Sequence, residues 1–466
     1  MLRFAAFALI FALGLTALDQ RVPLWKIRRP AAETTFYTGT TRNVTCSGTI
    51  TTALQDAVNA SSDLDVVSIG AGSCTSGRIT WTNKNIKVMG AGKTQTNITM
   101  TAGAFAITIS NATKAKFRIT GLHMTGASCS NSIIFINAEN ATSFSSGYRI
   151  DNNHIDYSAA CSNDPILGWG VQYGVFDNNT VDLANATNIL YAFFQTGLGE
   201  STFGTPAVND VGGWYNLSLP SQYGTDAAVF FEDNVFNVGN TGSPRACYDA
   251  SSGGARLVWR YNQSTGCYLY NHWVRRNDLD VFQCEVYNNT FTGNSWGNDS
   301  GEIWFRSESG TCVVYNNTIS GFSGASDIYV DDRRAEGIEA DTGQFLACDG
   351  TRAWDGNAGD PAAPGWPCLA QIGQGFGKTY AQITSGDKLP NLPFYAWNNG
   401  TQAGCSTGGA CTNSINIAEY FGGAGSNYVK GTAHPNGWFD FVNNGTTPMP
   451  GYTAYTYPHP LRSARN

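Results

Sequence analysis

A short phrase that ends in asparagine recurs along the middle of this chain and restricts its fold more than any other feature. Each copy alternates its side chains with a period of two residues before a polar corner. The copies end at Asn153, Asn179, Asn234, Asn262, Asn289 and Asn317. Their spacing is roughly 27 residues, with one interval of about twice that length, which we interpret as two repeats with one phrase lost or looped over. This period and alternation predict a solenoid of stacked β-strands.

Aligning the copies on the final asparagine sorts the residues into columns. The inward column is predicted to hold Ile150, Phe176, Phe231, Trp259, Val286 and Val314. The outward column is predicted to hold Asp151, Asp177, Glu232, Arg260, Tyr287 and Tyr315. Stacked asparagines about 4.8 Å apart can form an amide ladder, at a corner where asparagine tolerates a left-handed backbone. The architecture that satisfies these columns is a parallel β-helix.

The outward carboxylates offer a candidate ion site. Three stacked carboxylates could hold Ca²⁺ through oxygen ligands. The long interval between Asp177 and Glu232 would separate them, however, and this favours a solvated or arginine-paired face.

The first repeats carry a family resemblance. The segments Leu54-Gln-Asp-Ala-Val58, Asp65-Val-Val-Ser-Ile-Gly-Ala-Gly72 and Ile86-Lys-Val-Met-Gly-Ala-Gly92 resemble the opening rungs of the pectate-lyase-like superfamily. The resemblance covers residues 45–345 and implies an all-β, single-stranded, right-handed parallel β-helix. Residues 51–59 read as an amphipathic helix of the kind that often caps such a core. The superfamily includes polysaccharide lyases, glycoside hydrolases, phage tailspikes and adhesins, so it does not fix the chemistry.

The chain departs from the known catalytic patterns of that superfamily. The Gly-His-Gly and Asn-Thr-Asp motifs of polygalacturonase-like hydrolases are missing, as is a clear calcium-binding aspartate set. His123, His154, His434 and His459 have no evident partner in the sequence, which predicts structural or surface roles. The tail contains Trp354-Asp-Gly-Asn357, Gly365-Trp-Pro-Cys368 and Tyr455-Thr-Tyr-Pro-His-Pro-Leu461, and with these segments it resembles secreted β-helix repeat proteins of unknown activity.

Composition shifts suggest five segments. Residues 1–18 form an apolar run typical of a signal peptide, although the basic stretch 21–29 also suits an uncleaved anchor. We expect a polar linker over 19–45, a β-helix over 46–335 and a Cys/Gly/Pro-rich loop region over 336–390. The last segment, 391–466, should hold a final rung and an irregular C-terminal cap. An aromatic excursion, 188–223, falls inside the long interval.

The cysteines indicate an oxidising compartment. There are 12, with no C-x-x-C pair, which favours several disulfides over zinc. Cys348 with Cys368 and Cys405 with Cys411 flank glycine-rich loops and are the predicted pairs in the irregular C-terminal region. Cys284 and Cys312 occupy one column, where a disulfide and two stacked thiols are equally compatible with the spacing. We therefore expect a secreted protein, extracellular or periplasmic.

Charge and sequons bear on the partners. The net charge of −7 argues against nucleic acid, which requires a basic surface. It permits an acidic polysaccharide, because a local basic cleft can sit on an acidic body. Asn43 and Asn444 lie outside the repeats and are the preferred glycosylation sites among many sequons.

A second set of strands supplies a candidate site. The segments are Tyr268-Leu-Tyr-Asn-His272, Glu302-Ile-Trp-Phe-Arg306 and Asp327-Ile-Tyr-Val-Asp331. Stacking them on Leu269, Ile303 and Ile328 places two columns outside. One holds Tyr270, Trp304 and Tyr329, and the other holds His272, Arg306 and Asp331. Arg275 and Arg333 follow in the turns.

These columns suit a glycan cleft. Aromatic rings stack on sugars, and arginine binds carboxylates. In a lyase, Arg306 would neutralise a uronate, His272 or an arginine would remove the adjacent proton, and Tyr270 or Tyr329 would protonate the leaving oxygen. In a hydrolase, Asp331 would work with a second carboxylate, Asp332 or Glu302. An alternative interpretation of Arg306 beside Asp331 is a surface ion pair of little consequence.

The sequence thus predicts a secreted β-helix protein that binds or acts on polysaccharide, with a lyase acting on an acidic glycan favoured. The alternative is a non-enzymatic structural or adhesive β-helix, such as a filament subunit, adhesin or virion spike, which would act as a homo-oligomer or larger assembly.

Overall fold

The computed structural model describes most of the repeats and the end of the chain. The described residues are 36–101, 105–109, 116–126, 132–138, 145–157, 166–170, 172–183, 196–197, 223–238, 246–250, 256–271, 283–293, 304–307, 310–322, 328–331, 373, 375, 382, 385–387, 390, 392–401, 417–420, 441–443 and 446–464.

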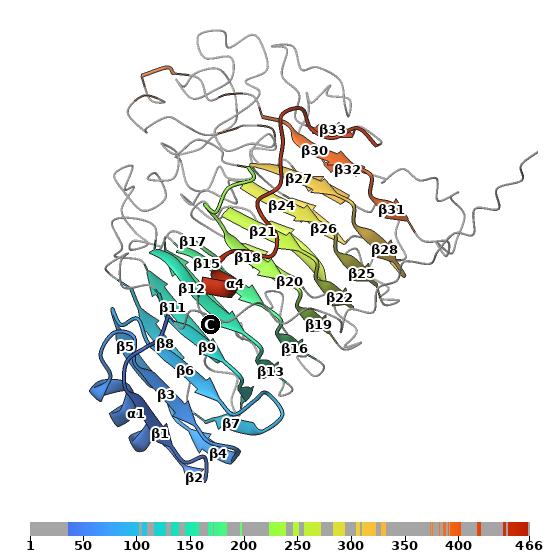
Figure 1. Ribbon diagram of the computed structural model, residues 1–466. Coiled ribbons are helices and arrows are strands. Elements are labelled where there is room, and N and C mark those ends of the chain that lie inside the picture. Colours follow the sequence, from blue (N-terminus) through green and yellow to red (C-terminus); the bar gives the residue numbers. More distant parts are fainter. Residues whose placement is uncertain are drawn as a thin grey trace, which may run out of the picture.

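Within these residues the chain winds into a solenoid of parallel strands with almost no helix, as predicted (Figure 1). Sheet A, the longest, stacks twelve strands. They are β1 (Thr41–Val44), β3 (Val66–Ile69), β6 (Lys87–Gly90), β9 (Arg118–Thr120), β12 (Ser145–Asp151), β15 (Gln172–Asp177), β18 (Val229–Glu232), β21 (Arg256–Arg260), β24 (Gln283–Tyr287), β27 (Thr311–Tyr315), β30 (Phe394–Trp397) and β33 (Phe441–Asn443). Strand β30 confirms the prediction that residues 391–466 contain a further rung of the solenoid.

Sheet B follows sheet A around each turn and stacks eleven strands. They are β2 (Gly48–Thr49), β4 (Gly72–Ser76), β7 (Thr96–Met100), β10 (His123–Gly126), β13 (His154–Asp156), β16 (Thr180–Asp182), β19 (Val235–Asn237), β22 (Gln263–Thr265), β25 (Thr290–Thr292), β28 (Thr318–Ser320) and β31 (Gly400–Thr401).

Two shorter sheets complete the turns. Sheet C contains β5 (Ile79–Thr82), β8 (Phe105–Thr108), β11 (Ile134–Ala138), β14 (Ile166–Gly170) and β17 (Thr196–Gly197). Sheet D contains β20 (Ala246–Ala250), β23 (Tyr268–Asn271), β26 (Phe305–Ser307), β29 (Ile328–Asp331) and β32 (Ile417–Tyr420). The described helices are α1 (Thr51–Ala60) and the short α4 (Leu461–Ala464).

The predicted inward column lies in the core. All six of its residues, from Ile150 to Val314, are almost completely buried in one continuous hydrophobic cluster. Helix α1 matches the predicted segment, and its Leu54 and Val58 are buried in the same cluster. Alternation alone therefore identified which face of each repeat packs inside.

The predicted asparagine ladder is confirmed and continues to Asn399. Each amide oxygen accepts from the side chain of the preceding asparagine, at N···O distances of 2.8 to 3.3 Å. It also accepts from that asparagine's backbone N–H, as Asn262 does from Asn234. The second amide hydrogen bonds a carbonyl of the preceding rung, as Asn234 does to Phe176 at 2.9 Å. The buried amides are thereby satisfied, as burial of polar groups requires.

Two details of the corner differ from the sequence prediction. The left-handed backbone occurs one residue before each ladder asparagine, for example at Asn152 (φ 54°) and Tyr261 (φ 58°). This bend directs the following side chain inward, so the ladder residue itself needs no unusual conformation. The long interval is also one rung and not two, because Asn179 donates directly to Asn234 and β15 pairs with β18. Apart from β17 and Tyr223, the excursion 188–223 lies outside the described residues.

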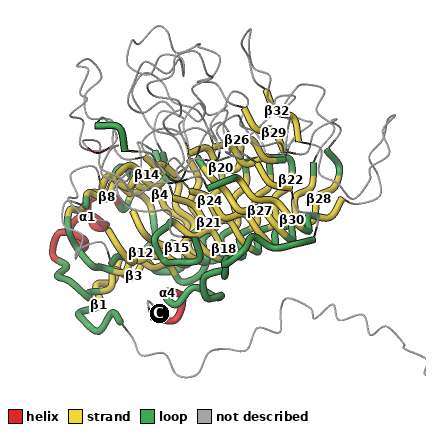
Figure 2. The backbone as a smooth tube through the Cα atoms, turned by 90° about the horizontal axis from the view of Figure 1, so that it is seen from above, coloured by secondary structure: helices red, strands yellow, loops and turns green. Residues whose placement is uncertain are grey.

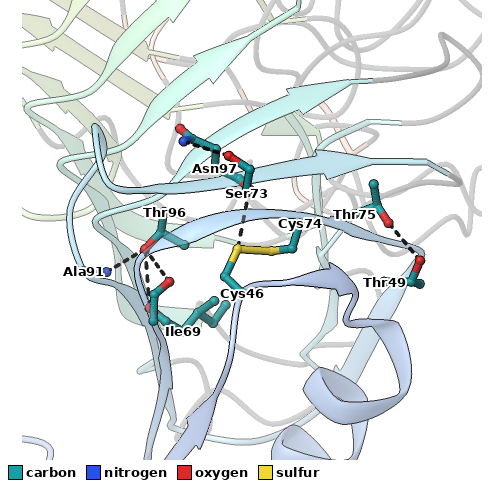
Figure 3. The surroundings of a disulfide bond; sticks show 10 residues. Cys46, Thr49, Ile69, Ser73, Cys74, Thr75, Ala91, Thr96 and Asn97 are labelled. Carbon is teal, nitrogen blue, oxygen red and sulfur yellow. Dashed lines mark hydrogen bonds between the residues drawn. A yellow bond between two sulfur atoms is a disulfide. The ribbon is translucent and has the colours of Figure 1, made fainter.

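In the described part of the chain, three disulfides join neighbouring turns. Cys46 pairs with Cys74 beside the first strands of sheet B (Figure 3), and Cys247 pairs with Cys267. Cys284 and Cys312 also form a disulfide across paired strands, with their Cα atoms 4.5 Å apart. These bonds indicate an oxidising, extracytoplasmic setting. The predicted pairs Cys348–Cys368 and Cys405–Cys411 lie outside the described residues.

The end of the chain lies along the solenoid. Residues 446–464, hereafter the C-terminal strap, run back over the outer face of sheet A to α4, which contacts β12 and β15 (Figures 1 and 2). The sequence predicted an irregular cap, but this part of the tail covers a side of the stack. In the described part of the chain, no helix has the length and apolar character to cross a membrane.

Candidate functional site

The site predicted from the second set of strands has a different register. In sheet D, Leu269 pairs with Phe305 and then Ile328. Arg306 therefore shares its column with Tyr270 and Tyr329, and it is two residues out of register with Asp331. The predicted alignment used Ile303 as the inward residue. Phe305 takes that position instead, packed 5.7 Å from Phe394 between ring centroids.

Trp304 belongs to the core and does not stand on the outer face as predicted. It is fully buried, and its ring lies 4.9 Å from Phe291. Arg306 remains half-buried on the outside, with its guanidinium carbon 4.9 Å from the Tyr270 ring centroid. His272, Arg275 and Arg333 lie outside the described residues, as do the side chains of Tyr329 and Asp331. The described residues thus bring together only Arg306 and Tyr270 from the predicted site.

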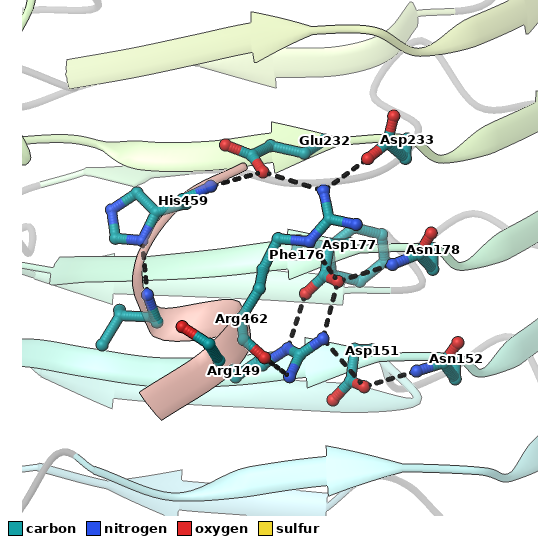
Figure 4. Close-up of polar contacts among 12 residues, drawn as sticks. Arg149, Asp151, Asn152, Phe176, Asp177, Asn178, Glu232, Asp233, His459 and Arg462 are labelled. Atoms are coloured by element: carbon teal, nitrogen blue, oxygen red, sulfur yellow. Dashed lines mark hydrogen bonds and ion pairs between the residues drawn. The ribbon is translucent and has the colours of Figure 1, made fainter. Parts of the chain in front are cut away.

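The outward carboxylates of sheet A are neighbours, but they are closed to solvent. Asp177 pairs in register with Glu232, and both side chains are fully buried. Arg149 binds Asp177 at 2.8 and 2.9 Å, while Arg260 binds Glu232. Arg462 of the C-terminal strap reaches both carboxylates, at 3.2 and 3.1 Å (Figure 4). The carboxylates of this face are paired with arginines, as the sequence favoured over a Ca²⁺ site. The sequence also predicted that Asp177 and Glu232 would be separated, but they lie on adjacent strands.

A different group of polar side chains is accessible on the outer face of sheet B. His123, His154, Asp156 and Asp182, here named the histidine cluster, come from the consecutive strands β10, β13 and β16. His123 pairs in register with His154, and Asp156 with Asp182. The residues between them, Met124, Ile155 and Val181, are fully buried and fix the cluster on the outside.

The histidine cluster is internally bonded. His154 Nε2 lies 2.6 Å from Asp182 Oδ2, and the other oxygen of Asp182 accepts from Asn237 Nδ2 at 2.8 Å. The imidazole of His123 stacks on that of His154, with centroids 4.2 Å apart and planes 9° from parallel. His123 Nδ1 is 3.0 Å from Asn97 Oδ1, and its Nε2 is 3.8 Å from Asp156.

Solvent exposure and charge make the cluster chemically usable. The four side chains keep 24% to 30% of their surface accessible. Burial, together with the neighbouring His154, lowers the pKa of His123, although Asp156 partly opposes the shift. His123 is therefore neutral at neutral pH. Its Nε2 is buried and has no hydrogen-bond partner among the described residues.

Lys93 adds a cation at the same place. Its ammonium donates to Thr180 Oγ1 at 3.0 Å, on the strand that carries Asp182. Burial lowers its pKa, and Asp182 opposes this shift. The cluster thus combines two imidazoles, two carboxylates and an ammonium. Among the described residues, no group of three or more His, Cys, Asp or Glu is arranged to hold a metal ion.

Sequence reasoning missed this cluster, since it expected His123 and His154 to be without partners. A usable signal existed in the repeat itself. His154 and Thr180 directly follow ladder asparagines, and Asp156 and Asp182 come two residues later. Extending the alignment past the corner would have placed each pair in one column. His459 is also buried with partners, since its ring lies 4.5 Å from that of Phe230 and its backbone N–H donates to Glu232. Burial, together with the charges of Arg260 and Arg462, lowers its pKa to about 3.

Comparison of the chain with protein-family models, curated proteins and solved structures finds no match. The proposal for function therefore depends on the geometry of the chain alone. Of the glycosylation candidates, Asn43 is exposed on β1 and Asn444 lies outside the described residues.

Proposed function

We propose that this is a secreted polysaccharide-active protein that binds its polymer along the outer face of sheet B and cleaves it at the histidine cluster. The observation that carries this proposal is the 2.6 Å contact of His154 with Asp182, stacked on a second imidazole and open to solvent. A histidine oriented by a carboxylate is a common general acid or base. A flat face of stacked strands also offers room for an extended polymer.

The hydrogen bonds suggest how the two histidines divide the work. The ionised Asp182 can only accept, so His154 donates from Nε2. With Nε2 donating to Asp182, Nδ1 is the nitrogen of His154 that can act as a proton acceptor. Asn97 accepts from His123 Nδ1, and the buried Nε2 of His123 faces Asp156 at 3.8 Å. The cluster can therefore take up one proton and hold it.

Two reactions would use such a cluster. In elimination, expected from the sequence for an acidic glycan, a histidine removes the proton beside a uronate carboxylate while Lys93 binds that carboxylate. In hydrolysis, Asp156 and Asp182 supply the carboxylates on which glycoside cleavage commonly depends. Both reactions require the cluster, so the choice between them does not affect the location of the site.

We further propose that the solenoid is right-handed, that α1 caps its first turn, and that the protein belongs with the pectate-lyase-like superfamily. Parallel strands joined by a crossover are nearly always connected with right-handed chirality. Leu54 and Val58 of α1 contribute to the core beside the first strands. The opening rungs have the sequence character described above.

A non-enzymatic assembly is the second candidate. Strand β1 is the first in sheet A, with β3 as its partner among the described strands, and β2 has the same position in sheet B. An edge strand of this kind can pair with another copy of the chain. This alternative predicts concentration-dependent oligomers and no polymer cleavage.

Replacing His154 with alanine is expected to reduce polymer cleavage by about 100-fold or more, the usual contribution of a general acid or base. Asp182→Asn should act in the same direction, because it removes the partner of His154. The assay follows new reducing ends for both reactions and absorbance of unsaturated uronates for elimination. Asp226→Asn, which changes an exposed carboxylate elsewhere, is the matched control and should keep full activity. If wild-type protein neither binds nor cleaves any polysaccharide in a broad panel, the proposed function is wrong.

A further inference from the structure

The outer face of sheet B has an unusual charge pattern that bears on the polymer. Each of the nine strands from β4 to β28 presents two outward side chains that flank a buried one. The first column holds Ser73, Asn97, His123, His154, Thr180, Val235, Gln263, Thr290 and Thr318. The second holds Thr75, Thr99, Thr125, Asp156, Asp182, Asn237, Thr265, Thr292 and Ser320. We name these two columns the hydroxyl track.

We infer that the polymer is an uncharged polysaccharide that lies along the solenoid axis on the hydroxyl track, an inference that rests on the proposed function. The outward positions of these nine strands include two carboxylates and no lysine or arginine. An acidic glycan carries a negative charge at regular intervals along its length. Its binding would require cations at similar intervals, since arginine and lysine are the usual partners of carboxylates.

The single ammonium at the cluster does not change this balance. Lys93 approaches from the turn before β7, and its hydrogen bond to Thr180 holds it next to Asp182. Asp156 and Asp182 would repel a carboxylate placed above the cluster. Beyond β16 the outward side chains of the track are neutral up to β28, and most of them are hydroxyls or amides.

The same side chains suit a neutral glycan. Hydroxyl and amide groups can both donate and accept hydrogen bonds, as sugar hydroxyls do. They repeat at the strand spacing of about 4.8 Å, so a polymer along the axis meets an equivalent pair of groups at each rung. The buried residues between the columns, such as Phe236, Phe291 and Ile319, keep the track flat and fixed. A polymer on this path crosses the histidine cluster.

An uncharged substrate without uronate esters implies hydrolysis. Elimination requires a proton made acidic by the carbonyl of a uronate or of its ester, and a neutral sugar ring without such a group has none. In hydrolysis the cluster protonates the leaving oxygen as the bond from C1 breaks. Water supplies the oxygen of the new C1–OH bond, and its second proton returns to a basic group of the cluster. Atoms and electrons balance without any further reactant.

The test uses polysaccharide pairs that share a backbone and differ in charge. Suitable pairs are xylan and glucuronoxylan, and hydroxyethyl- and carboxymethyl-cellulose. We expect at least one neutral member to bind about tenfold or more tightly than its charged partner, measured by affinity electrophoresis and calorimetry at low salt. Cleavage should yield reducing ends without absorbance from unsaturated uronates.

Two outcomes separate this inference from the proposed function. Tighter binding of the charged members would overturn the inference but leave the proposed function standing. If the protein binds no polysaccharide in any of these pairs, the proposed function itself is wrong. A double variant, Thr290→Lys with Thr318→Lys, adds cations to the track outside the cluster. It should shift preference toward the charged member, and an unchanged preference would show that the polymer does not lie on the hydroxyl track.

Discussion

Replacing Arg260 with alanine is expected to lower the free energy of unfolding by about 3–5 kcal/mol, the usual cost of breaking a buried ion pair. The side chain of Arg260 is fully buried. Its guanidinium binds Glu232, donates to the Tyr287 hydroxyl at 2.7 Å, and donates to the carbonyls of Tyr455 and Thr456. The variant leaves Glu232 buried with one fewer cation and releases two carbonyls of the C-terminal strap.

Urea denaturation of wild type and Arg260→Ala at one pH measures this loss. Arg78→Ala, which removes an exposed arginine, is the matched control and should change stability little. A loss below about 1 kcal/mol for Arg260→Ala would show that the strap and the hydrogen bonds of Arg260 contribute little to the stability of the folded state. We expect the strap to lose protection from proteolysis in the variant, because the guanidinium holds it at two successive residues.

Glu285 should make the stability of the protein depend on pH in the opposite sense to an ordinary ion-paired carboxylate. It is fully buried beneath the strap, where Tyr452 O–H donates to one oxygen at 2.7 Å and Gly224 N–H to the other at 2.8 Å. Burial raises its pKa to about 7 from an ordinary value of 4.5. Because the folded state holds the proton more tightly, the contribution to stability is complete below about pH 4.5 and is lost as pH rises through 7.

The variant Glu285→Gln removes this dependence. The difference in unfolding free energy, variant minus wild type, should increase by about 3 kcal/mol between pH 4.5 and pH 8, since each pKa unit is worth about 1.4 kcal/mol. Urea denaturation across that range gives the difference directly, and other titrating groups cancel in it. A difference that is flat, or that falls with rising pH, would mean that Glu285 is stabilised in its ionised form.

The sequence predicted those parts of the fold that follow from the two-residue alternation within a strand and from the regular spacing of the repeats. Alternation placed Phe231 and Trp259 inside, and the regular spacing aligned the ladder from Asn153 to Asn317. Excursion length carries no such information, so the interval before Asn234 was counted as two rungs. The strap was not predicted, because its contacts with sheet A join residues such as Arg149 and Arg462 that no local pattern relates.

The predicted register of the site was wrong where the period of the repeat left a choice. Ile303 and Phe305 are both apolar and lie two residues apart, on the same face of a strand, so either could pair with Leu269. Phe305 takes this position, where it packs against Phe394. The sequence did not predict that Phe394 lies nearby. The histidine cluster lies one residue beyond the ladder, in a register that period does fix. Its chemistry was therefore available in the sequence, whereas the burial of Trp304 was not.

The central claim, that polymer binds over the histidine cluster, can be tested by carbodiimide labelling of carboxylates read out by mass spectrometry. Labelling is compared with and without the neutral polysaccharide that binds best. Asp156 and Asp182 are partly exposed and should label in the free protein, as should the exposed Asp226 beside sheet A. The account predicts that polymer protects Asp156 and Asp182 and leaves Asp226 unchanged. Unaltered labelling of both cluster aspartates at saturating polymer would contradict it.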